Sequence, residues 1–217
     1  MSSSLPLYSV VKKSSLSKKS PLLVLLHGYG SDENDLFSFA NGLPSELCII
    51  SLRAPIKIIP YGYAWYNINF DENQNKWNDT EEAKKAMNMI LNCINVATSL
   101  YNIDKFNISL LGFSQGCILS LALALNNPKK FKNIIGLSGY LSEDFLNQSL
   151  KKDDYEHLNF YYSHGVSDQV IPVEWARKTS LFLKKLNLNF KYSEFPVGHG
   201  VSPQNFFELK NWLEKFI

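Results

Sequence analysis

The chain has 217 residues, 45% of them hydrophobic, which suits one domain spanning residues 1–217 with a substantial buried core. Its formal net charge of +2 is too small to indicate a nucleic-acid partner. The three cysteines stand at scattered positions without a C-x-x-C pair, which argues against a disulfide framework and against a zinc knuckle.

The N-terminal segment "MSSSLPLYSVVKK" lacks the basic-then-apolar order of a secretory signal. A cluster of lysines among serines predicts a solvated turn or loose segment, with a phosphate or lipid-headgroup patch as the alternative; the lysines are Lys12, Lys13, Lys18 and Lys19. The first strong apolar run, residues 22–26, is far too short to cross a bilayer, which needs about 20 residues. We therefore expect a cytoplasmic protein without a transmembrane segment.

Short apolar runs then alternate with amphipathic stretches nearly to the end of the chain. The runs predict strands, and several are apolar on consecutive residues, as strands covered on both faces require. The stretches predict helices, of which the clearest follows Asp79 as a cap, with Glu82 three residues later. This alternation predicts an α/β fold with a mostly parallel, twisted sheet and helices on both faces. The predicted strands are 22–26, 47–52, 106–112, 132–139, 158–165 and 188–195, and the predicted helices are 83–97, 114–125, 173–186 and 203–216.

Residues 61–77 interrupt this alternation, because they are rich in aromatic residues and asparagine but show no clear period. We expect a long loop there, and long ordered loops in compact domains tend to be functional. Tyr63, Trp65 and Tyr66 are candidates for the wall of an apolar substrate pocket. A plain packing role for these rings is an equal alternative.

The pentapeptide Gly112-Phe113-Ser114-Gln115-Gly116 has the pattern G-x-S-x-G between a predicted strand and a predicted helix. Glycines beside such a turn let the strand and helix approach each other, and the turn presents the serine hydroxyl at a helix N-terminus. A serine at its ordinary pKa is a poor nucleophile and needs a base nearby. The pattern therefore predicts Ser114 as a nucleophile.

The base and the acid are expected to follow the nucleophile in the order acid, then histidine. His199, between two glycines after the last predicted strand, fits the base. Asp168 is favoured as the acid because it follows a predicted strand at the carboxyl edge of the sheet. His164, near Asp168, is expected to be structural. Asp144, Asp153 and Asp154 also satisfy the chain order, whereas His157 reads as a surface residue.

An acyl-transfer site also needs donors for the developing oxyanion. The backbone N–H of Gln115, directly after the nucleophile, is one candidate. The second is the N–H of Tyr29, in the glycine-containing loop "HGYG" after the first predicted strand.

Several segments together resemble the phospholipase/carboxylesterase family of α/β-hydrolases, which includes bacterial carboxylesterases and acyl-protein thioesterases. The segments are "LHGYGSDENDL", "LRAP", "YAWYNI", "LLGFSQG", "SHGVSDQVIPVEWAR" and "GHGVSPQNFFELKNWL". The resemblance implies an α/β-hydrolase fold with Ser114, Asp168 and His199 as the catalytic triad and the amides of Tyr29 and Gln115 as the oxyanion hole. Cys117 departs from the glycine that is more usual there; we interpret it as helix packing, with an oxidisable thiol as the alternative.

We therefore expect a serine hydrolase of carboxylic esters, with thioesters and lysophospholipids as further substrates, acting without a metal or cofactor. Residues 139–156 leave room for one helix at most, so no large cap domain is expected and the site should be open. The expected partner is a small ester or acyl substrate, a lipidated protein being the alternative, and a homodimer stays open. Two rival interpretations are a catalytically silent binder of acyl or other small ligands and a peptidase on the same scaffold.

Overall fold

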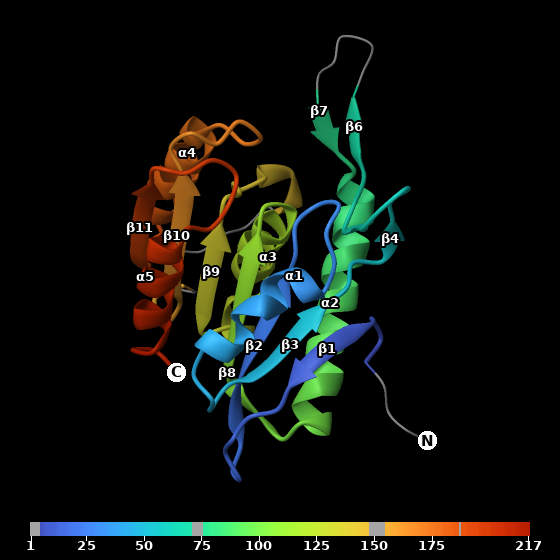
Figure 1. Cartoon of the computed structure of the whole chain (residues 1–217), viewed down its shortest axis with the longest axis vertical. Helices are drawn as coiled ribbons and strands as arrows, with labels where there is room; N and C mark the ends of the chain where they lie inside the picture. Colours follow the sequence, from blue (N-terminus) through green and yellow to red (C-terminus); the bar gives the residue numbers. More distant parts are fainter. Residues whose placement is uncertain (1–4, 71–75, 148–154, 187) are drawn as a thin grey trace.

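A seven-stranded sheet forms the centre of the computed structural model, which describes residues 5–70, 76–147, 155–186 and 188–217 (Figure 1). The strand order is β1-β3-β2-β8-β9-β10-β11. β1 runs antiparallel to β3, and each of the other neighbouring pairs is parallel. The strands are β1 (Ser9–Lys12), β2 (Ser20–Leu26), β3 (Cys48–Leu52), β8 (Ile103–Phe113), β9 (Asn133–Leu137), β10 (Asn159–Gly165) and β11 (Asn189–Phe195).

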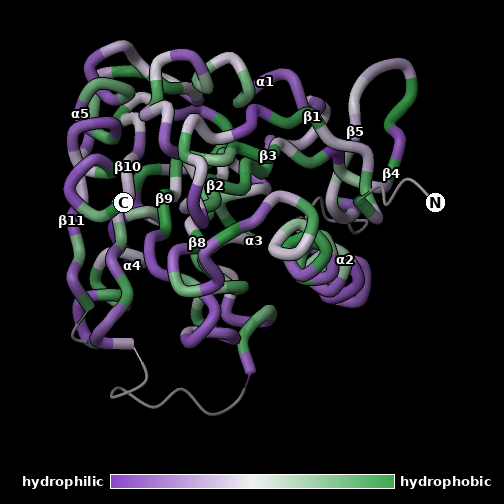
Figure 2. Tube along the Cα trace, turned by 90° about the horizontal axis from the view of Figure 1, so that it is seen from below, coloured by the Kyte–Doolittle hydropathy of each residue, from purple (hydrophilic) through white to green (hydrophobic). Residues whose placement is uncertain are grey.

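Alternate residues of the central strands face two separate cores, because successive side chains of a strand point to opposite faces. Leu22, Val24 and Leu26 of β2 belong to the larger core, which β2 shares with α2 (Thr80–Leu100), α3 (Gln115–Asn126) and α4 (Val173–Lys184). Leu23 and Leu25 belong to the second core, with α1 (Asn34–Phe37), η1 (Ser38–Gly42) and α5 (Pro203–Leu213). Figure 2 shows hydrophobic colour on the central strands and hydrophilic colour on the outer turns of α2.

The structure confirms the six predicted strands and the four predicted helices, with small shifts at their ends. Asp79 is the N-cap of α2, and its side chain accepts a hydrogen bond from the Glu82 N–H at 2.9 Å. α3 is buried along nearly its whole length, which explains its lack of a polar face. The fold is therefore the predicted mostly parallel sheet with helices on both faces.

Two expectations are corrected. The N-terminal segment is not loose throughout, because β1 pairs with β3 and the Lys12 ammonium donates to the Ala40 carbonyl at 2.7 Å. Residues 61–77 are not simply a loop, because short antiparallel pairs form there, and residues 71–75 lie outside the described part. These short strands are β4 (Ile56–Lys57) with β5 (Tyr63–Ala64), and β6 (Ile68–Phe70) with β7 (Lys76–Asn78).

The loops that follow the parallel strands gather at one end of the sheet, the upper edge in Figure 1. Between β9 and β10 the described residues 138–147 contain one short helical turn, η3 (Glu143–Phe145), while residues 148–154 lie outside the description. η2 (Pro128–Lys130) lies at the opposite end, before β9. Within the described ranges, no helix combines the length and the apolar character needed to span a membrane.

Candidate active site

Ser114 occupies the sharp turn between β8 and α3. Its backbone has φ 52° and ψ −116°, a conformation that non-glycine residues rarely adopt and that persists only when the surroundings enforce it. Two hydrogen bonds hold the turn: the Ser114 N–H donates to the Leu137 carbonyl at 2.9 Å, and the Ser114 carbonyl accepts from the Ile118 N–H at 3.1 Å. The strained turn therefore fixes the direction of the hydroxyl.

Glycines on both sides make this turn sterically feasible. A Cβ at Gly112 would overlap the Gly116 carbonyl, and a Cβ at Gly116 would overlap the Leu26 carbonyl. Strand β8, helix α3 and the end of β2 thus approach each other as closely as backbone atoms allow. The sequence pattern G-x-S-x-G corresponds here to a real contact between three elements.

Ser114, His199 and Asp168 form a continuous hydrogen-bonded chain. The Ser114 hydroxyl donates to His199 Nε2 at 2.9 Å, and His199 Nδ1 donates to Asp168 Oδ2 at 2.7 Å. The carboxylate can only accept, which places the imidazole proton on Nδ1 and leaves Nε2 free to accept. The three residues come from different loops, 85 and 31 residues apart along the chain.

Asp168 is surrounded by donors. Its Oδ1 accepts from the N–H groups of Val170 and Ile171 at 2.8 and 2.9 Å. Burial opposes ionisation, but these amides and His199 outweigh it and hold the pKa of Asp168 below its ordinary value. The carboxylate is therefore kept charged and fixed in orientation.

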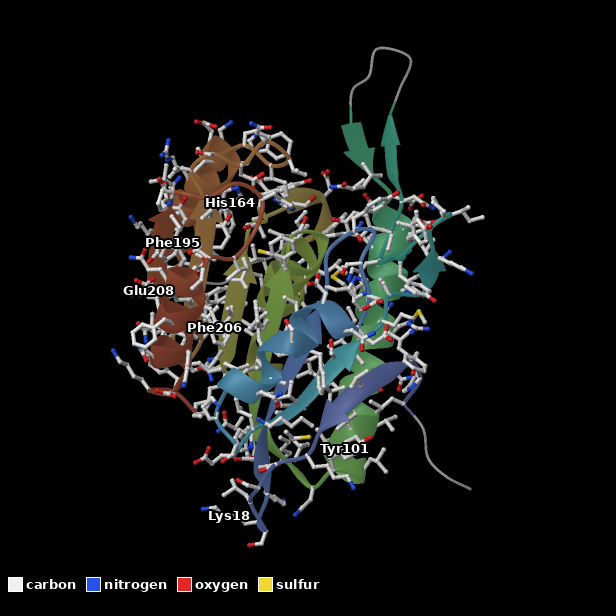
Figure 3. All side chains as sticks on the ribbon, viewed as in Figure 1. Lys18, Tyr101, His164, Phe195, Phe206 and Glu208 are labelled. Atoms are coloured by element: carbon white, nitrogen blue, oxygen red, sulfur yellow. The ribbon has the colours of Figure 1, made fainter. Side chains whose placement is uncertain are left out.

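His164, at the end of β10 (Figure 3), contacts the same carboxylate from a second side. Its Nε2 lies 2.9 Å from the Ile171 carbonyl and 3.2 Å from Asp168 Oδ2, so both acceptors face one N–H. Burial lowers the pKa of His164, which favours the neutral ring. This agrees with the structural role predicted for it.

The loops that carry Asp168 and His199 are held together by their backbones. The Val166 N–H donates to the Phe195 carbonyl at 2.9 Å, and the Ser167 N–H donates to the Val197 carbonyl at 3.0 Å. The Phe113 ring packs on the imidazole of His199, with centroids 4.9 Å apart. His199 keeps 18% of its side chain exposed, so the imidazole remains accessible while the Asp168 carboxylate is enclosed.

The two candidate oxyanion donors lie on either side of the serine. Gln115 is the first residue of α3, where a backbone N–H has no acceptor within the helix. Tyr29 lies in the loop after β2, and its neighbour Gly28 is packed close to the Ser114 side chain, since a Cβ at Gly28 would lie 3.3 Å from Ser114 Cβ. Both amides therefore belong to segments that adjoin Ser114.

The aromatic residues predicted to line a pocket have a different position. Trp65 and Tyr66 are 0% exposed, which leaves no surface for a direct substrate contact. The backbone of both residues bonds to the Gln115 side chain, and the Trp65 indole N–H donates to the His27 carbonyl at 2.9 Å. Tyr63 is half-buried, with the Arg53 guanidinium 4.6 Å from its ring centroid. For Trp65 and Tyr66 the structure favours the packing alternative, which the sequence left open because nothing local distinguishes a supporting ring from a lining one.

Other sequence candidates lie away from the serine or outside the description. Asp144 is exposed in η3, and His157 is exposed with its ring nitrogen Nε2 2.9 Å from the Pro128 carbonyl. Asp153 and Asp154 lie outside the described residues. Cys117 is fully buried beneath the turn, and burial raises the pKa of its thiol, which fits packing rather than an exposed reactive group. Among the residues with a described placement, no three or more His, Cys, Asp or Glu side chains are grouped to hold a metal ion.

Known proteins resemble this chain in sequence and in fold. The chain is 25% identical to acyl-protein thioesterase 1 of Yarrowia lipolytica, over 98% of this chain and 99% of that protein. It is 26% identical to acyl-protein thioesterase 1 of Mycosarcoma maydis, over 96% of each. The Bacillus cereus carboxylesterase structure superposes with a TM-score of 0.81 at 19% identity, covering 97% of this chain and 95% of that one, and so shares the fold. The profile of the Phospholipase/Carboxylesterase family matches residues 8–217, and the chain belongs to that family.

Proposed function

We propose that this protein hydrolyses carboxylic esters and acyl thioesters through an acyl-enzyme on Ser114. The observation that carries the proposal is the hydrogen-bonded chain from the Ser114 hydroxyl through His199 to Asp168, at 2.9 and 2.7 Å. A silent binding protein has no need of such a chain. The similarity to acyl-protein thioesterases supports a lipidated protein as one substrate class.

In the acylation step, the Ser114 oxygen attacks the carbonyl carbon while His199 Nε2 takes the hydroxyl proton. The carbonyl oxygen becomes an oxyanion, which accepts from the backbone N–H groups of Tyr29 and Gln115. When the tetrahedral intermediate collapses, the bond to the leaving alcohol or thiol breaks and His199 returns the proton to it. Asp168 stabilises the imidazolium throughout.

In the deacylation step, a water molecule takes the place of the leaving group. His199 Nε2 accepts one water proton as the oxygen attacks the acyl carbon, and the same two amides stabilise the second oxyanion. Collapse releases the carboxylic acid and returns the proton to the Ser114 oxygen. The cycle consumes one ester or thioester and one water and needs no cofactor.

A peptidase would need a charged group to hold a peptide terminus. Both arginines of the chain are engaged elsewhere: Arg53 forms two hydrogen bonds with Glu33 at 2.6 Å, and Arg177 forms two with Glu194 at 2.8 Å. These pairings favour an ester or thioester substrate over a peptide.

The test is hydrolysis of p-nitrophenyl esters of increasing acyl length, with an acyl thioester assayed in parallel. We expect turnover of both classes by the wild type and its loss in Ser114→Ala, which removes only the nucleophilic oxygen. No turnover of any ester or thioester by folded wild-type protein would refute the proposal. Equal turnover by Ser114→Ala would refute it as well.

A further inference from the structure

We propose that the Gln115 side chain positions both oxyanion donors at once, by holding residues 63–66 against the loop that carries Tyr29. This inference rests on the proposed acyl transfer at Ser114. It assigns to one side chain, which touches no substrate, the alignment of two amides from separate segments of the chain.

The first step is the bond between Gln115 and the aromatic segment. Its Oε1 accepts from the Trp65 N–H at 2.8 Å, and its Nε2 donates to the Tyr66 carbonyl at 2.7 Å. The residue is 1% exposed, so neither bond competes freely with water. A flipped amide would place a donor against a donor, which fixes a single orientation.

The second step is the bond between the aromatic segment and the Tyr29 loop. The Gly30 N–H donates to the Tyr63 carbonyl at 2.9 Å, and the Tyr63 N–H donates to the Ser31 carbonyl at 2.8 Å. On the other side of Tyr29, the His27 carbonyl accepts from the Trp65 indole at 2.9 Å. Hydrogen bonds to residues 63–66 therefore hold the chain on both sides of Tyr29.

Steric contact makes the arrangement stiff. Gly62 has φ +82°, and a Cβ there would overlap the Gly30 carbonyl, so the two backbones are in direct contact. The His27 ring packs at 5.4 Å from the Trp65 ring, and its Nε2 accepts from the Ala54 N–H at 3.0 Å. Trp65 lies between the Tyr29 loop and α3, and this position explains its complete burial, which a substrate role would not.

Misplaced oxyanion donors should destabilise the transition state more than the bound substrate. An oxyanion forms only as the carbonyl carbon becomes tetrahedral, and losing one donor costs about 10²–10³ in kcat in comparable sites. Misplacing both donors without deleting them should cost about 10- to 100-fold in kcat. KM should stay within about twofold, because the ground-state carbonyl makes weaker use of these donors.

Gln115→Met tests this by keeping the length of the side chain and removing both hydrogen bonds. Gln115→Glu, when its carboxyl is ionised, keeps an acceptor for the Trp65 N–H but sets a carboxylate against the Tyr66 carbonyl, and should also lose activity. Asn126→Leu is the matched control, at the other end of α3. There the Asn126 amide accepts from the Asn147 N–H and donates to the Phe145 carbonyl, both at 2.8 Å.

The readouts are kcat and KM for p-nitrophenyl butyrate, affinity for an alkyl boronic acid that mimics the tetrahedral state, and the acid limb of kcat/KM against pH. We expect kcat and boronate affinity to fall together in Gln115→Met. KM and the midpoint of the acid limb should stay unchanged, because the Ser114–His199 pair is intact. Asn126→Leu should lower Tm and keep kcat. Trp65→Phe, which removes the indole N–H together with part of the buried ring, should lower kcat in the same way and serves if Gln115→Met does not fold.

The inference is overturned if folded Gln115→Met and Trp65→Phe keep wild-type kcat, or if Asn126→Leu loses as much kcat as Gln115→Met. Either result with an active wild type leaves the proposed hydrolase function standing. An inactive wild type refutes the hydrolase function instead, so the two failures are distinguishable.

Discussion

Asp168→Asn is the substitution that most sharply tests the catalytic role proposed for Asp168. In the folded protein Asp168 Oδ1 accepts two backbone N–H groups, and Oδ2 faces His199 Nδ1 at 2.7 Å and His164 Nε2 at 3.2 Å. In the asparagine variant, the two backbone donors require the amide oxygen on their side. The amide NH₂ then faces His199 Nδ1, which must turn its lone pair toward it.

That change places the imidazole proton on Nε2, facing the Ser114 hydroxyl, where it can no longer accept the serine proton. The wrong tautomer costs about 10⁴-fold in kcat in serine hydrolases with this geometry, or ~5.5 kcal/mol at 1.36 kcal/mol per tenfold change. The opposite flip of the amide is no better, because it sets two N–H donors against the NH₂. We therefore expect a loss of about 10⁴-fold with KM little changed.

The assay is steady-state hydrolysis of p-nitrophenyl butyrate, with active sites counted by a fluorophosphonate probe. Asp144→Asn is the control, because Asp144 satisfies the same chain order but is exposed in η3, and it should keep wild-type kcat. A folded Asp168→Asn protein that loses less than about tenfold in kcat would refute the tautomer argument. A large loss in Asp144→Asn would place the acid elsewhere.

Gly116→Ala should lower Tm and activity together, because its Cβ would overlap the Leu26 carbonyl and overpacking costs about 1–3 kcal/mol or more; an unchanged Tm contradicts this. Glu33→Gln should lower Tm at neutral pH and flatten its fall in acid. The hydrogen bonds from Arg53 hold the pKa of Glu33 below its ordinary 4.5, although burial opposes this. The stabilisation from this pair is therefore present above pH 4.5 and is lost as the pH falls through the pKa of Glu33 in the folded protein. Parallel curves of Tm against pH for the wild type and the variant would contradict this. The three thiols should resist Ellman's reagent until urea is added, because burial raises the pKa of Cys48 to about 11 and also raises those of Cys93 and Cys117. Rapid labelling of the native protein would contradict this.

The strands and the turn at Ser114 could be predicted because their signals are local. Residues 22–26 are continuously apolar, as a strand buried on both faces must be, and the glycines beside Ser114 meet a steric need within five residues. His199 and Asp168 were placed by chain order and by the edge at which parallel strands end. The structure brings both side chains to the serine, and their catalytic roles remain proposals.

The parts that sequence reasoning missed depend on contacts between distant segments. β1 ends in a lysine and its residues are half-buried, because an edge strand has one open side, so its pattern resembled a solvated segment. Trp65 pairs with Gln115, 50 residues away, and with His27, 38 residues away. No local pattern reports such pairs, which is why a supporting ring could not be told from a pocket wall.

Intact-protein and peptide mass spectrometry of the acylated protein tests the central claim most directly. The protein would be mixed rapidly with p-nitrophenyl butyrate and quenched in acid. We expect one butyryl group per chain, on the peptide that contains Ser114, and none on Ser114→Ala. Acylation of a different residue, or full turnover by Ser114→Ala, would contradict it.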